Sequence, residues 1–390
     1  MRFNRFIIAL CAFAACGLAL STHAAPVLEE HLNAARAKHN LPALAAAVVS
    51  DSEILAFDAV GVRNIHPMAG EEADWNNLSD AARFHIGSCT KSMTATMIAT
   101  LVETGAIKWE TTIDEVFPEL KPKIKPDYVN VTLRQLLTHT GGVVAATAGN
   151  SEESKAMRAL TGSTLEQRAG MIEILLNFEP VGAPGTKSRY SNAGYGIAAA
   201  MAERVTGESW ETLMRQRLFD PLKMTSTGFG WPATEDHPYE PLGHSMRDDT
   251  LISRPILDVY KLQAPIAPAG DVHCSIEDLA RFAQMHLRGL RGQQTILKSE
   301  TVVLLHEPAA DNYACGWVKR KMVGHEAHWH NGSAGTFFAW MTIFPEKNLA
   351  IVVATNSGTG EKACAELTNA LLKEFTTEES EPRMNTDEHR

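Results

Sequence analysis

The stretch His85-Ile86-Gly87-Ser88-Cys89-Thr90-Lys91-Ser92-Met93 places a serine three residues before a lysine. Beyond Lys91 the apolar residues recur at helical spacing until Gly105, namely Met93, Met97, Ile98, Leu101 and Val102. This spacing predicts a core helix that begins beside Ser88. The side chains of Ser88 and Lys91 would then lie on one helix face, one turn apart.

Ser88 and Lys91 are candidate catalytic residues. A serine hydroxyl becomes a good nucleophile when a base accepts its proton, and a lysine can be that base if burial or nearby charge lowers its pKa. A helix N-terminus also directs backbone N–H groups at developing negative charge. A serine that caps a helix beside a solvated lysine would have the same Ser-x-x-Lys sequence, so the assignment depends on the rest of the chain.

A second element is Tyr190-Ser191-Asn192-Ala193-Gly194-Tyr195, where a loop rich in Gly and Pro leads into a predicted helix. A phenol near a cationic lysine ionises more easily and can carry the proton of Ser88, which makes Tyr190 a candidate relay. The amide of Asn192 can hold a substrate carbonyl and bond to Lys91. A helix cap with a packed aromatic is the structural alternative.

A third element is His330-Asn331-Gly332-Ser333, on a predicted strand. Such a strand can donate a backbone N–H to a reacting carbonyl, and Gly332 leaves room where a substrate would lie. These residues extend the candidate site to substrate binding.

The remaining pattern predicts strands at both ends of the chain and helices between them. Strands are expected at 44–49, 53–62, 328–331, 336–343 and 349–355, and helices at 27–38, 133–138, 165–177, 193–205, 210–218, 276–287 and 362–375. We therefore expect an α/β fold of the α+β type, with one antiparallel sheet flanked by helices and an inserted all-α lobe. The sheet lobe would span 25–105 and 320–375, and the α-rich lobe 106–319.

The two ends of the chain differ from this domain. Arg2 and Arg5 precede an apolar run over 6–20 and then small residues, which predicts a signal peptide at 1–24. The run is too short to span a membrane, so we expect export to the periplasm or medium without stable membrane insertion. Anchoring as a lipoprotein through Cys16 is the less favoured alternative. Residues 376–390 are polar and predict a disordered tail.

Composition excludes several other functions. Removal of Arg2 and Arg5 changes the formal net charge from −10 to −12, which argues against nucleic acid or anionic membranes as partners.

A metal site could be suggested by His325, His328 and His330. However, His325 lies too far back along the strand and no supporting carboxylate follows, so we expect neither metal nor cofactor. Four cysteines remain after the signal, and their pairing and the oligomeric state stay open: Cys89, Cys274, Cys315 and Cys364.

Together, the three elements resemble the serine penicillin-recognising superfamily, in particular the branch with class C β-lactamases, D-Ala-D-Ala carboxypeptidases, D-aminopeptidases and β-lactamase-like esterases. Similar stretches also occur at 136–142, 190–210, 219–225 and 278–282. The resemblance implies Ser88 as the acylated nucleophile, Lys91 as its base and Tyr190 as the proton relay. It implies Asn192 as a substrate and lysine contact, and the backbone N–H groups of Ser88 and Ser333 as the oxyanion hole.

Two departures bear on the substrate. Class C β-lactamases have lysine where this chain has His330, and a glutamine where it has Ala146. A small ester, amide or D-amino-acid peptide is therefore favoured, with at most weak action on β-lactams. The alternative is a sensor-like penicillin-binding protein that acylates without turnover. If His330 contacts a substrate carboxylate and keeps its ordinary pKa, preference for anionic substrates should fall between about pH 6 and 8.

Overall fold

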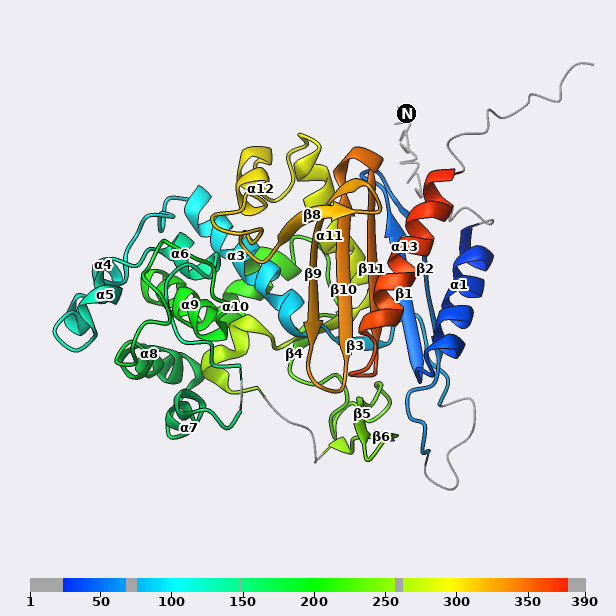
Figure 1. Cartoon of the computed structure of the whole chain (residues 1–390), viewed down its shortest axis with the longest axis horizontal. Helices are drawn as coiled ribbons and strands as arrows, with labels where there is room; N and C mark the ends of the chain where they lie inside the picture. The colour runs from blue at the N-terminus through cyan, green and yellow to red at the C-terminus, as the bar shows by residue number, and fades with distance from the viewer. Residues whose placement is uncertain (1–23, 68–75, 148, 257–261, 378–390) are drawn as a thin grey trace, which may run out of the picture.

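The computed structural model describes residues 24–67, 76–147, 149–256 and 262–377. Both ends of this range build one antiparallel six-stranded sheet in the order β2-β1-β11-β10-β9-β8 (Figure 1). Its strands are β1 (Ala43–Val49), β2 (Ile54–Gly61), β8 (Val318–Met322), β9 (His325–Ser333), β10 (Phe338–Phe344) and β11 (Leu349–Thr355). The predicted sheet shared by the two ends is confirmed.

Helices cover both faces of this sheet. Helices α1 (Ala24–Lys38) and α13 (Glu361–Thr377) pack together on one face, and α11 (Ile276–Leu290) packs on the other (Figure 1). Along β1, Leu44 and Val48 belong to the core under α1 and α13, whereas Ala45 and Val49 belong to the core under α11. Because both faces are covered, β1 is apolar along its whole length and β11 is apolar up to its last residue, Thr355.

A helical lobe lies beside the sheet, with α3 (Thr90–Glu103) where the two meet (Figure 1). Helix α3 is buried on nearly every side, which explains why its sequence is not amphipathic. The other helices outside the sheet layers are α4 (Ile113–Val116), α5 (Pro126–Val129), α6 (Leu133–Leu137), α7 (Glu152–Arg158), α8 (Thr164–Leu175), α9 (Asn192–Thr206), α10 (Trp210–Met214) and α12 (Ser299–Leu305).

The segment 106–319 is rich in helices, as expected, but it is not all helical, because it also contains short strands. Strand β3 (Arg83–His85) pairs with β7 (Val272–Ser275), which pairs with β4 (Gly228–Phe229), and β5 (His244–Arg247) forms a hairpin with β6 (Thr250–Ser253). Strands of two to four residues are too short to show an alternating pattern. His85 of β3 and Ser245 of β5 line the larger cavity described below.

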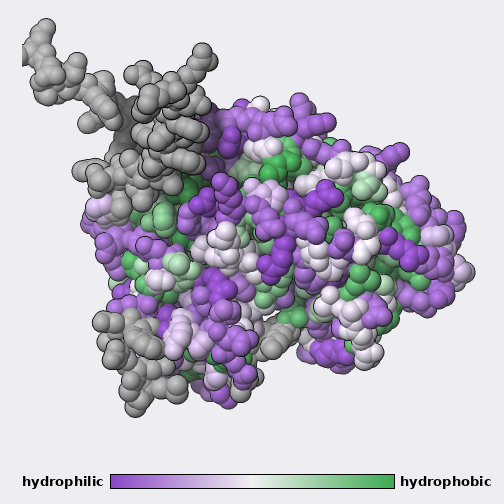
Figure 2. Space-filling view, turned by 180° about the vertical axis from the view of Figure 1, so that it is seen from behind, coloured by the Kyte–Doolittle hydropathy of each residue, from purple (hydrophilic) through white to green (hydrophobic). Residues whose placement is uncertain are grey.

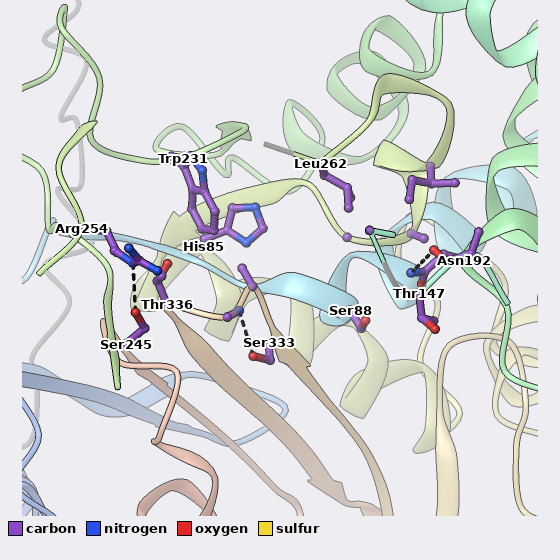
Figure 3. Close-up of a pocket in the computed structure, with 17 residues that line it drawn as sticks. His85, Ser88, Thr147, Asn192, Trp231, Ser245, Arg254, Leu262, Ser333 and Thr336 are labelled. Atoms are coloured by element: carbon purple, nitrogen blue, oxygen red, sulfur yellow. Dashed lines mark hydrogen bonds between the residues drawn. The ribbon is translucent and has the colours of Figure 1, made fainter. Parts of the chain in front are cut away.

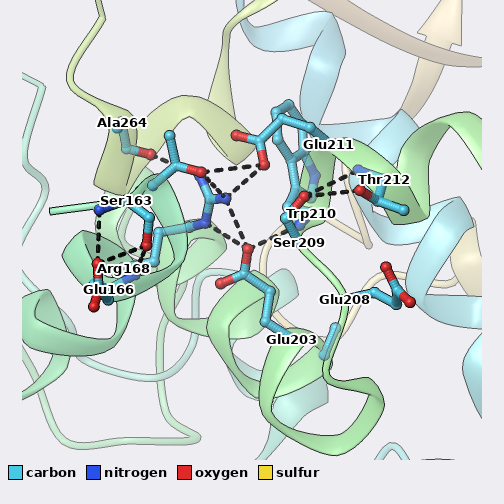
Figure 4. A network of polar contacts seen from close by, with 12 residues as sticks. Ser163, Glu166, Arg168, Glu203, Glu208, Ser209, Trp210, Glu211, Thr212 and Ala264 are labelled. Atoms are coloured by element: carbon cyan, nitrogen blue, oxygen red, sulfur yellow. Dashed lines mark hydrogen bonds and ion pairs between the residues drawn. The ribbon is translucent and has the colours of Figure 1, made fainter.

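A buried ion-pair network ties the helices of the lobe together (Figure 4). The guanidinium of Arg168 on α8 is fully buried and contacts Glu203 on α9 and Glu211 on α10, each at 2.7 Å. It also donates to the backbone oxygen of Ala264 at 3.0 Å. Ala264 begins a short turn that ends at Ala269, so the network fixes the turn that contacts Lys91 below.

The predicted signal peptide and tail fall mainly outside the described residues, and α13 continues to Thr377, past the predicted boundary at 375. Within the described part, no helix is long and apolar enough to cross a membrane.

The face of the molecule in Figure 2 is mainly hydrophilic, with apolar groups scattered across it. All four cysteines left after the predicted signal peptide are buried free thiols.

Candidate active site

Ser88 lies in a single turn of 3-10 helix, Gly87–Cys89, directly before α3. Strand β9 passes close against this turn. A Cβ atom on Gly332 would overlap the backbone oxygen of Ile86 and lie 2.5 Å from Ser88 N, and one on Gly87 would lie 2.6 Å from Ser333 N. Gly87 also has a positive φ of 50°. Only glycine permits this approach of two backbones.

This geometry corrects the interpretation of Gly332. The sequence suggested that its missing side chain leaves room for substrate, whereas the structure uses that room for the turn that carries Ser88. The close approach places the backbone of Ser333 beside that of Ser88. Two neighbouring backbone N–H groups are the usual donors of an oxyanion hole.

Lys91 is fully buried and directs its amine at the serine. Its Nζ donates to Asn192 Oδ1 at 2.8 Å and to the backbone oxygen of Ala269 at 2.8 Å, and it lies 3.2 Å from Ser88 Oγ. Burial lowers the pKa of Lys91 well below its ordinary value, and no carboxylate is among these partners to oppose the shift.

The three contacts suit a neutral amine. A neutral lysine has two N–H donors and one lone pair. The two shorter contacts are to oxygen atoms that can only accept, so the lone pair is left for the longest contact, the Ser88 hydroxyl. In this state Lys91 can accept the serine proton, as nucleophile activation requires.

Tyr190 lies just before α9, and its hydroxyl donates to Ser88 Oγ at 2.6 Å. Its ring lies over the amine, with Lys91 Nζ 4.5 Å from the ring centre. Burial of the hydroxyl raises the pKa of Tyr190, although the residue as a whole is 40% exposed. The sequence-based expectation that Lys91 makes this phenol ionise easily is not met, because burial is the dominant effect on the pKa of Tyr190 and raises it.

Asn192 is the first residue of α9, and the preceding Ser191 caps the helix by accepting from Gly194 N at 3.0 Å. The cap fixes the direction of the Asn192 side chain. Its Oδ1 is occupied by Lys91, and its Nδ2 donates to the backbone oxygen of Ala146 at 3.3 Å. The predicted contact with the lysine is present, and the amide also lines a cavity.

His330 differs from its expected behaviour. The residue is only 4% exposed, its Nδ1 donates to the backbone oxygen of Asn331 at 2.6 Å, and its Nε2 lies 3.1 Å from the Tyr313 hydroxyl. Burial, and then the nearby Lys91, lower the pKa of His330 to about 3. The expectation of a histidine that changes charge near neutral pH is therefore not met, because the ring is buried and lies near Lys91.

Two cavities meet at Ser88. The larger, of about 680 Å³, includes Asn192, Ser333 and Trp231, and extends to Arg254, which donates to Ser245 Oγ at 3.0 Å (Figure 3). Figure 3 shows Ser88 between Asn192 on one side and Ser333 on the other. The smaller, of about 420 Å³, is lined by Ser88, Tyr190, Tyr313, Val318, Trp329, His330, Asn331, Gly332, Ser333 and Phe338. Ser88 is thus open to solvent space on two sides.

Sequence reasoning missed three contributors to this site. The backbone oxygen of Ala269 has no side-chain signal, and Tyr313 comes from an irregular loop with no motif. His139 lies in the stretch 136–142 that carried the resemblance, yet no role was assigned to it. Among the described residues, no three His, Cys, Asp or Glu side chains are arranged to hold a metal ion.

The sequence profile of the Beta-lactamase family matches residues 28–374, nearly all of the chain. The chain belongs to the Beta-lactamase family. This assignment agrees with the fold and with the serine, lysine and tyrosine that converge at the cleft. Proteins of the Beta-lactamase family are generally serine hydrolases, and membership does not by itself fix a substrate.

Two relatives show how widely the Beta-lactamase family differs in length. Penicillin-binding protein 4 of Amycolatopsis lactamdurans is 26% identical over 365 residues, which cover 89% of each chain. Protein flp of Staphylococcus aureus is 21% identical over 332 residues, which cover 82% of this chain and 60% of that protein. The chain therefore matches only part of the longer relative.

Solved structures show the same Beta-lactamase fold. An octameric penicillin-binding protein homologue from Pyrococcus abyssi aligns with a TM-score of 0.72 at 23% identity, over 89% of this chain and 77% of that one. The D-alanine carboxypeptidase AmpC from Burkholderia cenocepacia aligns with a TM-score of 0.66 at 20% identity, over 88% of this chain and 98% of that one. At these identities the likeness concerns the fold.

Proposed function

We propose that this protein is a serine hydrolase that forms an acyl-enzyme on Ser88 and hydrolyses small esters or amides. One observation carries the proposal: the Tyr190 hydroxyl and the Lys91 amine lie 2.6 and 3.2 Å from Ser88 Oγ. The lowered pKa of Lys91 favours the neutral amine, which can act as a base, and the raised pKa of Tyr190 keeps its hydroxyl protonated, so that it can act as an acid.

Acylation follows from these protonation states. Ser88 Oγ bonds to the substrate carbonyl carbon as neutral Lys91 accepts the serine proton. When the bond to the leaving group breaks, the Tyr190 hydroxyl protonates the departing oxygen or nitrogen, and the proton held by Lys91 restores the phenol. The net transfer moves the Ser88 proton to the leaving group.

The carbonyl oxygen becomes negative in this step and needs hydrogen-bond donors. The backbone N–H groups of Ser88 and Ser333 are the proposed donors, which the two glycines Gly87 and Gly332 bring together. Asn192 lines the larger cavity and would contact the acyl group. A water that takes the place of the leaving group, with Tyr190 and Lys91 acting in reverse, would complete hydrolysis.

The smaller cavity supports an uncharged leaving group. Tyr190, the proposed proton donor to the leaving group, lines this cavity and not the larger one. Among its described lining residues none is a lysine, arginine, aspartate or glutamate, and His330 is neutral. A substrate carboxylate beside the scissile bond, as in β-lactams and D-alanyl-D-alanine, would lose its water without gaining a cation. Esters and amides without that carboxylate are favoured.

A substrate panel tests the proposal. Nitrocefin, short-chain p-nitrophenyl esters and D-alanyl-D-alanine peptides are assayed with the wild type and with Ser88→Ala. We expect turnover of the esters, little turnover of the two carboxylate-bearing classes, and none by the variant. Release of D-alanine as fast as ester hydrolysis would overturn the substrate class, and activity in Ser88→Ala would overturn the nucleophile.

A sensor that acylates without turnover is the second candidate carried over from the sequence. Release of p-nitrophenol from a short-chain p-nitrophenyl ester distinguishes the two if it is followed over time. An enzyme should continue to release p-nitrophenol after the first equivalent, whereas a sensor should stop after about one equivalent per Ser88. Export through the signal peptide at 1–24 is also proposed, and its test is N-terminal sequencing of the protein recovered outside the cytoplasm.

A further inference from the structure

His139 follows α6 and packs beside the candidate active site. It has a positive φ of 60°, a conformation that costs energy for any residue other than glycine. The residue is 2% exposed, so its ring is enclosed by the protein. A strained backbone at a buried polar residue next to a reactive group calls for a structural reason.

Three contacts of His139 surround the segment that carries Tyr190. The backbone oxygen of His139 accepts from Arg189 N at 2.7 Å, and its Nδ1 accepts from Ser191 N at 3.2 Å. Its ring packs on the Tyr190 ring with 4.5 Å between centres. One residue therefore holds the backbone before Tyr190, the backbone after it and the ring itself.

The chemistry of the imidazole fits this arrangement. Because Nδ1 accepts a hydrogen bond, the proton of the neutral ring is on Nε2, and Nε2 has no hydrogen-bond partner among the described residues. Burial and the nearby Lys91 lower the pKa of His139 well below its ordinary value. A cationic ring would lose the bond from Ser191 N, so the neutral form is the one that holds the segment.

Tyr190 needs such support because it lies in neither a helix nor a strand and the residue is 40% exposed. We propose that His139 is a positioning residue that sets the Tyr190 hydroxyl against Ser88 Oγ for proton transfer to the leaving group. This inference rests on the proposed function. Small displacements of a catalytic group from its productive position can cost about a hundredfold in rate.

A double-mutant cycle tests the proposal with two acetate esters. Phenyl acetate has the more basic leaving group and needs the proton from Tyr190 more than p-nitrophenyl acetate does. We expect His139→Leu to lower kcat/KM for phenyl acetate by about 10- to 100-fold and for p-nitrophenyl acetate by less. In the Tyr190→Phe background the same substitution should change either rate by no more than about twofold.

Two further variants separate the parts of the contact. His139→Asn tolerates positive φ and keeps an acceptor near Nδ1, whereas His139→Phe keeps the ring and loses the acceptor. We expect His139→Asn to recover part of the loss, and it replaces His139→Leu in the cycle if the leucine variant fails to fold. His286→Leu, at a buried histidine without a contact to Tyr190, is the matched control and should retain wild-type kcat/KM.

The outcomes distinguish this inference from the proposed function. If a fluorescent fluorophosphonate does not label Ser88 in the folded wild type, the proposed function fails. If labelling occurs but His139→Leu lowers the rate equally in both backgrounds, or equally for both esters, His139 has only a structural role and the inference is overturned. A loss confined to KM would overturn it as well.

Discussion

Strand β9 contributes one histidine to each of two groups of buried histidines. The two histidines, His328 and His330, are two residues apart, and only the group that contains His330 borders Ser88. His330 belongs to the active-site group with His139. His328 belongs to a second group, a chain of contacts from Thr96 on α3 through His286 and His306 to His328 and Glu326. Since alternate residues of a strand face one side, His328 and His330 point to the same face of the sheet.

Burial lowers the histidine pKa values in both groups, to about 3 for His286 and His330 alike. A perturbed pKa therefore reports burial here and does not identify the site. The groups differ in access and in pairing. In the second group the ring nitrogens from His286 to His328 are bonded in sequence, at 2.9 and 3.2 Å between rings. In the active-site group, His330 lines the smaller cavity beside Ser88. Catalytic side chains are therefore recognised because they meet at an open cleft, whereas a lowered histidine pKa alone does not separate them from buried structural residues.

Ser88→Ala should produce the largest effect on the active-site side of this comparison. We expect kcat to fall by roughly a millionfold because no other oxygen can form the acyl bond. The melting temperature should stay within about 2 °C, since the turn keeps its backbone contacts. Ester hydrolysis and thermal unfolding of the same preparation check both statements, and residual activity above a few per cent contradicts the assignment.

Lys91→Ala should lower the rate of acylation by about 100- to 10,000-fold. The substitution removes the base and leaves Asn192 Oδ1 and the Ala269 oxygen without their shared donor. Single-turnover labelling by a fluorescent fluorophosphonate measures acylation directly. Near-normal labelling would show that another group accepts the proton of Ser88.

His306→Leu should lower stability and leave activity unchanged, the opposite of what is expected for Ser88→Ala. His306 bonds to both His286 and His328, so its loss leaves two buried nitrogens without a partner. We expect the free energy of unfolding to fall by about 2–4 kcal/mol, with kcat of the folded protein unchanged. Denaturant unfolding and ester kinetics are compared with those of the wild type. A large fall in kcat without loss of stability would place this chain of histidines in the mechanism.

His286 predicts how stability depends on pH. Its pKa is about 3 in the folded protein and about 6.5 when unfolded, so between these values the unfolded chain binds more protons. Its contribution is complete above about pH 6.5 and is lost as the pH falls. At pH 5 the loss should be about 2 kcal/mol relative to pH 7.5. His286→Leu should show a shallower decline in unfolding free energy over this range, and an equal slope would contradict the shift.

The sequence predicted the long apolar strands well, since β11 has the predicted bounds Leu349–Thr355. It missed β8, whose sequence Val318-Lys319-Arg320-Lys321-Met322 is charged because it forms an edge of the sheet. It also missed the short strands of the middle segment. Edge strands lack the burial on both faces that makes central strands apolar along their length, and strands of two to four residues are too short to show a pattern.

For the site, sequence motifs predicted the residues whose side chains meet at Ser88, and the structure brings Lys91, Tyr190 and Asn192 together there. The motifs could not predict Ala269 or Tyr313. A backbone oxygen has no sequence signature, and a loop residue without a motif is brought to the site only when the chain folds. The protonation states of Tyr190 and His330 could not be predicted from the sequence either, since they depend on burial that no local pattern specifies.

The smallest expected effect concerns His330 of the active-site group. The sequence alone led us to expect that kcat/KM for a carboxylate-bearing substrate would fall relative to a neutral ester as the pH rises from about 6 to 8. With the pKa of His330 lowered to about 3, the ring is neutral throughout that range. The ratio should therefore stay flat, within about twofold, and the common titration of Lys91 cancels in it. A ratio that falls about tenfold would mean that His330 leaves its bond with Tyr313 and becomes charged when an anion binds, in which case the buried geometry described above belongs to the free protein alone.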